Sequence, residues 1–264
     1  MDGFGRETFN QFNHEAFNQF ALDNGVVGFF QQPITLKSGR QSHWYANWRT
    51  VADDAFLLDK LTDYVLAFTK THGLQPDCFF GVPEGATKLA LLTQYKWAKQ
   101  SPQYAPGSHC LPMGRGKPKF HGAPKDRYFL GEPRGKIVVL EDVTTTGGSL
   151  LTTIHRLRSL DDVKIIAAIG LTNRMELTPF IDGDSRGTVV TFKKIFEETT
   201  GHKYERPMGV PEVIRYAGIE YAAMSSATFL LPAARERLNL REDITSAVNR
   251  EFQRYGVVGK IEWK

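Results

Sequence analysis

The chain has 264 residues, of which 41% are hydrophobic and 23% are charged, and this balance excludes a disordered protein. The formal net charge of +4 suits anionic substrates, but the Lys and Arg residues are scattered, which argues against a nucleic-acid-binding protein. No run of residues is long and apolar enough for a membrane span, and no apolar targeting segment opens the chain. We therefore expect a cytoplasmic protein, with Cys78 and Cys110 as reduced core residues.

Helical and extended patterns alternate along most of the chain. Apolar residues at helical spacing predict helices over 13–23, 53–70, 87–98 and 189–199, from 230 onward, and past 240. Short apolar runs bounded by turn-forming residues predict strands over 28–36, 78–82, 137–141, 164–172 and 219–224. This alternation predicts an α/β fold with a parallel sheet, whose ligands bind at the carboxyl ends of the strands.

Residues 137–149 combine a buried strand, two carboxylates and a loop of small polar residues. The carboxylates are Glu141 and Asp142, and the loop is Thr144, Thr145, Thr146, Gly147, Gly148 and Ser149. Helix N-terminal amides after such a loop favour a phosphate, and adjacent carboxylates can accept hydrogen bonds from a ribose diol. The run therefore predicts a site for a phosphorylated pentose, and the plain alternative is an ordinary strand-to-helix turn with an acidic strand end.

Residues 139–149 resemble the signature of type I phosphoribosyltransferases, which bind phosphoribosyl pyrophosphate (PRPP). The resemblance implies that Glu141 and Asp142 orient the ribose diol and that residues 144–149 hold the 5′-phosphate. It also implies a type I phosphoribosyltransferase-like parallel sheet flanked by helices, with a small hood subdomain.

Residues 35–40, Thr-Leu-Lys-Ser-Gly-Arg, and the aromatic residues after them resemble the amino-terminal motif of orotate phosphoribosyltransferases. In that family the lysine contacts PRPP and the aromatic residues approach the orotate ring, which implies these roles for Lys37 and Tyr45. Ala46 stands where bacterial members often have a second aromatic residue. Without the resemblance, Lys37 and Arg40 would be ordinary residues of a solvated turn.

Residues 82–86, Val-Pro-Glu-Gly-Ala, follow the second predicted strand. The resemblance implies that this loop, with Glu84 and Gly85, receives the pyrophosphate of PRPP through backbone amides, often beside a non-proline cis peptide. Many bacterial members have Tyr-Lys where this chain has Glu84-Gly85, and Lys88 is the nearby cation that could replace the missing one. The alternative is a plain turn that starts a helix.

Residues 115–128 are cationic and interrupted by Gly and Pro, which predicts a mobile loop. Alone, this pattern is more typical of an ordinary solvated surface loop. Arg115, Lys119, His121 and Gly122 resemble the catalytic loop of orotate phosphoribosyltransferases, in which Gly116 replaces a lysine. The resemblance implies that Lys119, Arg115 and His121 are catalytic and neutralise the departing pyrophosphate. Because the family's loop closes over the neighbouring subunit's site, it also implies a homodimer.

Arg174 follows the strand predicted over 164–172 and could be an ordinary strand-end charge. In the family, an arginine here pairs bidentately with the orotate carboxylate, a geometry that lysine does not supply. The predicted orotate-binding residues are therefore Tyr45, Thr145 and Arg174.

Together these resemblances imply transfer of ribose 5-phosphate from PRPP to orotate, giving orotidine 5′-monophosphate and pyrophosphate in pyrimidine biosynthesis. They imply Mg²⁺ held mainly by PRPP rather than by protein ligands. Two alternatives stay open: a phosphoribosyltransferase for another base, and a non-catalytic PRPP-binding regulator. The predicted division is a hood segment (1–50), a phosphoribosyltransferase core (51–238) with an insertion at 201–217, and a carboxyl-terminal helical extension (239–264).

Overall fold

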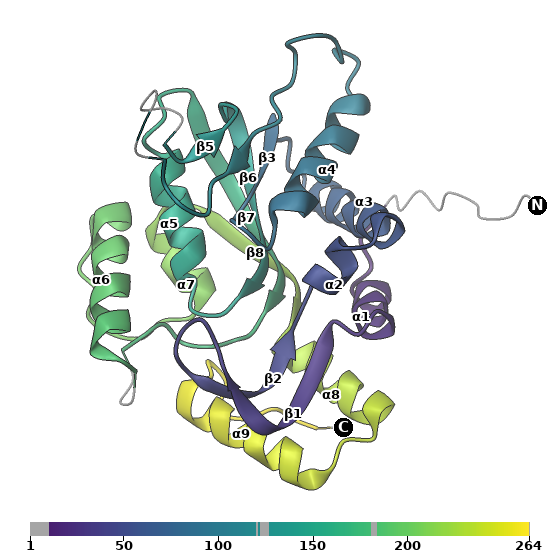
Figure 1. The fold of residues 1–264 in the computed structure, drawn as a ribbon, viewed down its shortest axis with the longest axis vertical. Helices are drawn as coiled ribbons and strands as arrows, with labels where there is room; N and C mark the ends of the chain where they lie inside the picture. Colours follow the sequence, from purple (N-terminus) through teal and green to yellow (C-terminus); the bar gives the residue numbers. More distant parts are fainter. Residues whose placement is uncertain (1–10, 120, 122–126, 181–183, 264) are drawn as a thin grey trace, which may run out of the picture.

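The structure is a computed structural model that describes residues 11–119, 121, 127–180 and 184–263. A parallel sheet in the order β3–β6–β7–β8 lies at its centre (Figure 1). Its strands are β3 (Cys78–Gly81), β6 (Gly135–Thr144), β7 (Val163–Asn173) and β8 (Glu220–Ser226). The predicted α/β fold with a parallel sheet is thereby confirmed.

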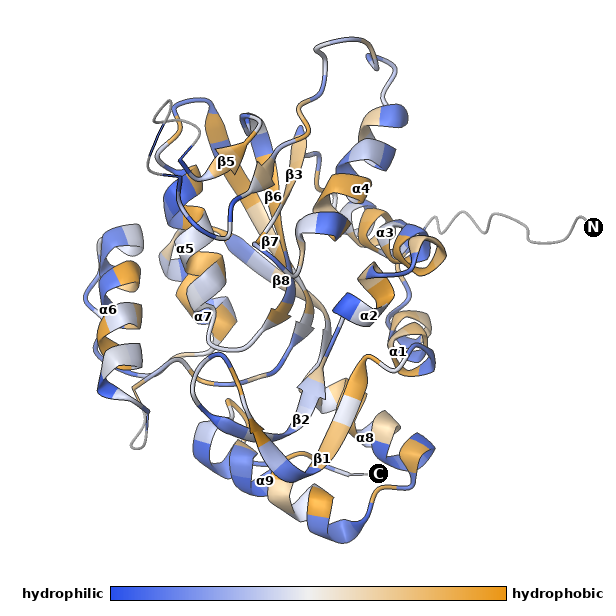
Figure 2. Ribbon diagram, in the orientation of Figure 1, coloured by the Kyte–Doolittle hydropathy of each residue, from blue (hydrophilic) through white to orange (hydrophobic). Residues whose placement is uncertain are grey.

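Alternate residues of the central strands face two separate hydrophobic cores. Phe79, Val138 and Leu140 enter one core, whereas Phe80 and Val139 enter the other. Figure 2 shows the hydrophobic residues concentrated on the central strands and on parts of the helices beside them. Because both faces of the sheet are covered, these strands have continuous apolar runs instead of an apolar–polar alternation.

Helices flank the sheet on both faces. On one side lie α3 (Ala55–Thr71) and α4 (Thr87–Lys99), and on the other α5 (Gly148–Leu157), α6 (Arg186–Thr200) and α7 (Val210–Tyr216) (Figure 1). Side-chain caps set two of their starts, because Asp54 accepts the Leu57 N–H of α3 and Ser185 accepts the Thr188 N–H of α6. The short α2 (Arg49–Ala52) precedes α3, and a two-stranded ribbon pairs β4 (Met113–Gly114) with β5 (Phe129–Leu130).

Elements from the amino-terminal and carboxyl-terminal parts of the chain pack together below the carboxyl edge of the sheet (Figure 1). There the antiparallel hairpin β1 (Val27–Thr35) and β2 (Gln41–Ala46) lies beside α1 (His14–Asp23), α8 (Ala227–Leu238) and α9 (Glu242–Tyr255). Trp44 of β2 shares a core with Leu230 of α8 and with Val248 and Phe252 of α9. The helix that the sequence sets apart as an extension thus packs directly on the hairpin.

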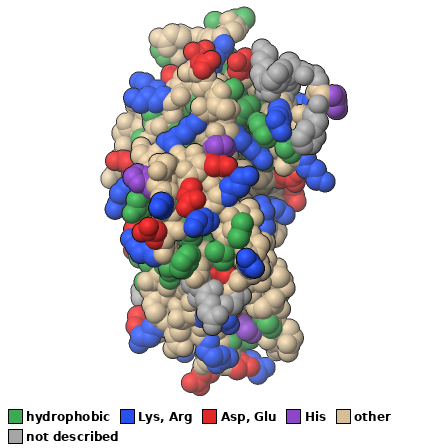
Figure 3. Space-filling model, turned by 90° about the vertical axis from the view of Figure 1, so that its left-hand side faces the viewer, with side chains coloured by type: hydrophobic (Ala, Val, Ile, Leu, Met, Phe, Trp, Pro, Cys, Tyr) green, Lys and Arg blue, Asp and Glu red, His purple; other side chains and the backbone are tan. Residues whose placement is uncertain are grey.

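Charges of both signs are mixed over the face that carries α6 (Figure 3). On α6 itself, Lys193 and Lys194 lie 3.9 Å from Glu197 and Glu198, one turn further along the helix. Among the described residues, this face shows no continuous basic stripe (Figure 3). Among the helices within the described ranges, none has the length and apolar character needed to cross a membrane.

Candidate active site

A cleft of about 770 Å³ opens at the carboxyl ends of β3, β6 and β7. Because these strands are parallel, the loops that follow them meet at one edge of the sheet, and the turn of the β1–β2 hairpin reaches them from below. The predicted site residues that line the cleft are Lys37, Tyr45, Glu84, Gly85, Glu141, Asp142, Thr145, Thr146, Gly147, Gly148, Ser149 and Arg174. Segments far apart in the sequence therefore converge on one cavity.

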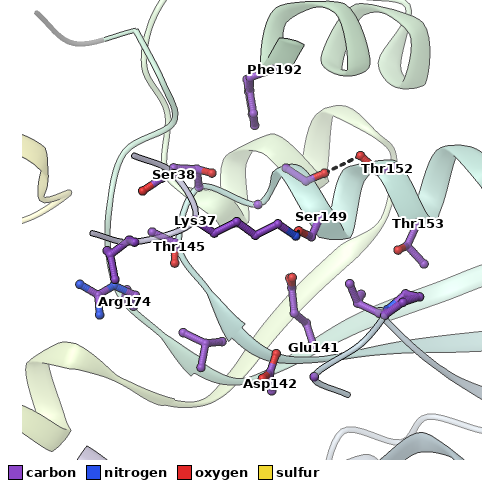
Figure 4. Close-up of a pocket in the computed structure, with 18 of the residues that line it drawn as sticks. Lys37, Ser38, Glu141, Asp142, Thr145, Ser149, Thr152, Thr153, Arg174 and Phe192 are labelled. Atoms are coloured by element: carbon purple, nitrogen blue, oxygen red, sulfur yellow. Dashed lines mark hydrogen bonds between the residues drawn. The ribbon is translucent and has the colours of Figure 1, made fainter. Parts of the chain in front are cut away.

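The start of α5 forms a cationic corner of this cleft. Gly147 is the N-cap residue, with a φ of 78° that favours glycine, and no side chain of the described residues caps the helix. Lys37 extends across the cleft, and its Nζ donates to Ser149 Oγ at 3.0 Å (Figure 4). Open helix amides, the helix dipole and a lysine together suit a phosphate group.

Glu141 and Asp142 form the acidic side of the cleft, at the end of β6 (Figure 4). Burial, reinforced by the charge of Asp142, raises the pKa of Glu141 well above its usual range, and Lys37 opposes this shift. Burial also raises the pKa of Asp142, whereas the Val143 N–H and the charge of Arg49 lower it. Glu141 Oε2 is buried without a hydrogen-bond partner among the described residues, so this carboxylate is arranged to accept from a ligand.

The loop over residues 82–86 contacts the acidic pair. Its Pro83–Glu84 peptide bond is cis, which confirms the expected non-proline cis peptide. At Gly85 a Cβ atom would lie 2.1 Å from Asp142 Oδ2, so only glycine lets the loop backbone approach this carboxylate so closely.

Glu84 and Gly116, two departures from the family pattern, lie against each other. A Cβ on Gly116 would lie 2.5 Å from Glu84 Oε1, and both residues line the cleft. The glutamate side chain therefore occupies the space that a side chain at residue 116 would need. The two departures are linked by packing.

Lys88 does not supply the cation missing from this loop. It is exposed, it donates to Asp53 Oδ1 at 2.6 Å and to the Ala52 carbonyl, and it does not belong to the described lining of the cleft. The suggested replacement is wrong because an acidic residue beside α2 holds this lysine. Arg49, at the start of α2, lines the cleft instead.

The predicted catalytic residues lie outside the cleft lining in the described part of the chain. The backbone N–H of Arg115 donates to the Tyr128 carbonyl and that of Lys119 to the Arg127 carbonyl, while His121 is exposed. Gly122 and residues 123–126 of the same loop lie outside the described residues. The roles of Lys119, Arg115 and His121 therefore stay predictions.

Thr144 is the one residue of the predicted phosphate loop that turns away from the cleft. It is fully buried, and its hydroxyl lies 2.6 Å from the Tyr221 hydroxyl, under the sheet edge. Its side chain gives no support to the predicted contact with PRPP.

Arg174 lies at the end of β7 and lines the cleft although only 2% of it is exposed. Its guanidinium carbon lies 3.9 Å from the centre of the Trp44 ring. Nε donates to Glu176 at 2.8 Å, and the terminal nitrogens donate to the Trp44 carbonyl and to Ser42 Oγ. Within the described residues these bonds use three of its five N–H groups, which leaves one on each terminal nitrogen.

Two cations of the cleft, Arg49 and Arg156, were not predicted from the sequence. Arg156 follows Ser149, Thr152 and Thr153 on one face of α5, so helical spacing from Ser149 was the signal for it. Arg49 had no such local signal, because its position depends on how α2 packs. The amino-terminal half of α6, including Phe192, closes another side of the cleft (Figure 4).

Comparison with known proteins places this cleft in a family. No protein-family model matches the chain. Over 158 residues the chain is 34% identical to the orotate phosphoribosyltransferase of Bradyrhizobium diazoefficiens, covering 56% of this chain and 77% of that relative. The chain belongs to the orotate phosphoribosyltransferase family.

Other members of the family agree with this assignment over more of the chain. The orotate phosphoribosyltransferase of Agathobacter rectalis is 26% identical over 219 residues, which cover 78% of this chain and 94% of that protein. The solved orotate phosphoribosyltransferase of Francisella tularensis superposes with a TM-score of 0.58 at 20% identity, covering 91% of this chain and 99% of that one. At that identity the superposition supports the fold alone.

Proposed function

We propose that this protein transfers the ribose 5-phosphate group from PRPP to N1 of orotate, giving orotidine 5′-monophosphate and pyrophosphate. The observation that carries the proposal is the union, in one cleft, of the acidic pair Glu141 and Asp142, the open start of α5 and the guanidinium of Arg174. Membership of the orotate phosphoribosyltransferase family supports the same activity.

The cleft offers a place for each part of PRPP. The amides of residues 145–149 and the Lys37 ammonium suit the 5′-phosphate, and Glu141 with Asp142 suits the two ribose hydroxyls. The backbone of Glu84 and Gly85 suits the pyrophosphate. This arrangement would hold the anomeric carbon between the strand ends, facing the base.

Orotate would lie between Tyr45, Thr145 and Arg174. The two N–H groups of Arg174 that the described residues leave unused match the two oxygens of the orotate carboxylate. A purine or uracil has no such carboxylate, so this arginine would favour orotate among the bases.

Catalysis would be mainly electrostatic. The anomeric carbon becomes oxocarbenium-like as its bond to pyrophosphate breaks, and negative charge collects on the leaving group. Lys119, with Arg115 and His121, would neutralise that charge once their loop lies over the site, and closure would exclude water. Orotate can attack as an anion, so neither Glu141 nor Asp142 is needed as a general base.

Mg²⁺ is the proposed cofactor, and PRPP would supply most of its ligands. This ion keeps waters and substrate phosphates in its coordination shell and needs at most one or two protein carboxylates, which Glu141 and Asp142 in the cleft could provide. In residues 11–119, 121, 127–180 and 184–263, no cluster of three or more His, Cys, Asp or Glu side chains could hold a metal ion. When bound with PRPP, the ion would supply positive charge to the pyrophosphate.

A homodimer and a cytoplasmic location are part of this proposal. The dimer follows from the family resemblance of residues 115–122, whose loop would serve the neighbouring subunit. The free thiols of Cys78 and Cys110 are consistent with a reducing compartment.

The decisive experiment follows the ultraviolet absorbance of orotate after addition of purified protein, PRPP and Mg²⁺, with a PRPP-free control and an Asp142→Asn variant. We expect a PRPP-dependent loss of orotate with release of pyrophosphate, and little loss in the variant. Competition with uracil and purines tests the base. Turnover of another base alone, or a rise in melting temperature with PRPP without any turnover, would overturn the proposal.

A further inference from the structure

We propose that Glu251 of α9 is a positioning residue for base recognition: through Ser42 it fixes the guanidinium of Arg174 in the orientation that binds the orotate carboxylate. The inference rests on the proposed function and adds a role for the carboxyl-terminal helix, which lies outside the family resemblance. Three sets of contacts support it: from Arg174 to Ser42, from Ser42 to Glu251, and from the end of α9 to the segment that follows Arg174.

Ser42 is the link between the guanidinium and the helix. Its Oγ lies 2.9 Å from Arg174 Nη2, 2.8 Å from Glu251 Oε2 and 2.9 Å from the Trp44 carbonyl. A serine hydroxyl has a single hydrogen, and a carboxylate accepts it more strongly than a carbonyl does. Donation to Glu251 leaves the oxygen lone pairs for Arg174, which has only N–H donors.

Glu251 is itself held as an acceptor on both of its oxygens. Oε1 accepts the His43 backbone N–H at 2.6 Å and faces His43 Nδ1 at 2.7 Å, while Oε2 faces Ser42. Glutamine is nearly the same size but presents an NH₂ group on one side. Whichever way the amide turns, it places a donor against either His43 or Ser42, and the Ser42 hydroxyl no longer donates to a carboxylate.

The end of α9 is joined to the segment that follows Arg174. The Leu177 N–H donates to the Tyr255 carbonyl and the Val257 N–H to the Met175 carbonyl, both at 2.7 Å. On the other side of Arg174, Glu176 Oε1 accepts from its Nε and Glu176 Oε2 accepts from Arg40. Glu251 and the arginine are therefore fixed within one hydrogen-bonded unit.

The test compares steady-state kinetics of the wild type, Glu251→Gln and Ser42→Ala in the full-length protein. Losing one hydrogen bond to a charged group corresponds to about a tenfold change, so we expect the orotate KM to rise about tenfold in each variant. The PRPP KM and kcat should stay within about twofold, because the change is confined to binding of the base. Glu242→Gln, the same substitution at an exposed position of α9, should leave both KM values unchanged.

A double variant separates positioning from general weakening. If Glu251 acts through Ser42, then Ser42→Ala with Glu251→Gln raises the orotate KM no further than the larger single change. An unchanged orotate KM in Glu251→Gln, or equal rises in the KM of orotate and PRPP, would overturn the inference. If Glu251→Gln does not fold, Glu251→Asp takes its place, because the shorter side chain withdraws the carboxylate from Ser42 and keeps its charge. The wild-type protein is assayed in the same experiment. If it does not consume orotate, the proposed function itself is refuted, and this outcome is distinct from a failure of the inference about Glu251.

Discussion

Replacing Glu141 by glutamine should make the protein more stable and a poorer binder of PRPP. Glu141 is only 6% exposed, its Oε2 has no hydrogen-bond partner among the described residues, and a second carboxylate stands beside it. In the protein without substrate, the ionised form of this side chain is a buried charge next to a like charge. Glutamine keeps the shape and removes the charge.

The size of the gain follows from these contacts. A buried polar group without a partner costs about 1–3 kcal/mol, and more when it is charged. Because the glutamine amide remains a buried polar group, we take the lower limit, about 1 kcal/mol, which raises the melting temperature of a domain of this size by about 2–4 °C.

The gain should depend on pH in a defined direction. The folded-state pKa of Glu141 is raised above its usual value of 4.5, so unfolding releases a proton between these two values. The contribution of Glu141 to the free energy of unfolding is therefore fully present below about pH 4.5, and it is lost as the pH rises through the raised pKa. Glutamine does not titrate, so the advantage of Glu141→Gln should be absent at low pH and grow toward pH 8.

The assay is thermal unfolding of both proteins between pH 4 and 8, with and without PRPP and Mg²⁺. PRPP should stabilise the wild type more than the variant, because the ribose hydroxyls lose a charged acceptor worth about tenfold in affinity. Glu236→Gln, an exposed substitution on α8, is the matched control. A variant less stable than the wild type at pH 8, or a difference that does not change with pH, would refute the reasoning.

Three further predictions concern the loop residues and the thiols. Lys119→Ala should lower kcat by about 10²–10³-fold with little change in PRPP binding, measured by turnover and by titration with PRPP, since its charge acts on the leaving group; unchanged turnover would contradict this role. The Gly116→Lys variant should bind PRPP better when Glu84→Ala makes room for the new side chain. A double-mutant cycle of PRPP affinity should then give a coupling energy of about 0.5–3 kcal/mol. Additive effects would show that the two positions are independent. The neighbouring Cys78 thiol, aided by Arg134, lowers the pKa of Cys110, so alkylation by iodoacetamide should begin at a lower pH than for an ordinary thiol, and Cys110→Ser should abolish it; a pH profile like that of a free thiol would contradict this.

The sequence predicted best those features that depend on neighbouring residues. Thirteen residues contain the buried run of β6, the two carboxylates near its end and the loop after it. In the structure they form a strand, a wall of the cleft and the start of a helix. Lys37 and Ser149 are 112 positions apart, so no periodicity could pair them, and only the resemblance placed both at one site.

The features that the sequence did not predict correctly depend on residues far apart in the chain. Lys88 has the right charge and lies one turn after the loop, but Asp53 on another segment holds it, and sequence spacing does not reveal such a long-range ion pair. Arg49 reaches the cleft because α2 packs between the hairpin and α3, which is a tertiary effect. Local patterns thus predict what each segment is, while the cations of the site depend on how the segments pack.

The segments predicted as an insertion (201–217) and as a carboxyl-terminal extension (239–264) bond to the same short stretch from opposite sides. From the insertion at 201–217, the Met208 carbonyl accepts the Thr178 N–H, and the Met208 N–H donates to Thr178 Oγ1. From the carboxyl-terminal extension, residues 255 and 257 bond to Leu177 and Met175.

Residues 174–179 are therefore paired on both flanks, and Arg174 and Pro179 at their two ends line the cleft. The insertion also supports the phosphate corner, because Val210 packs against Gly147, where a Cβ would lie 3.4 Å from its Cγ2. A larger side chain at Val210 would push on the loop that holds the 5′-phosphate without touching PRPP. We therefore expect substitutions in either segment to change the geometry of the proposed active site rather than its chemistry.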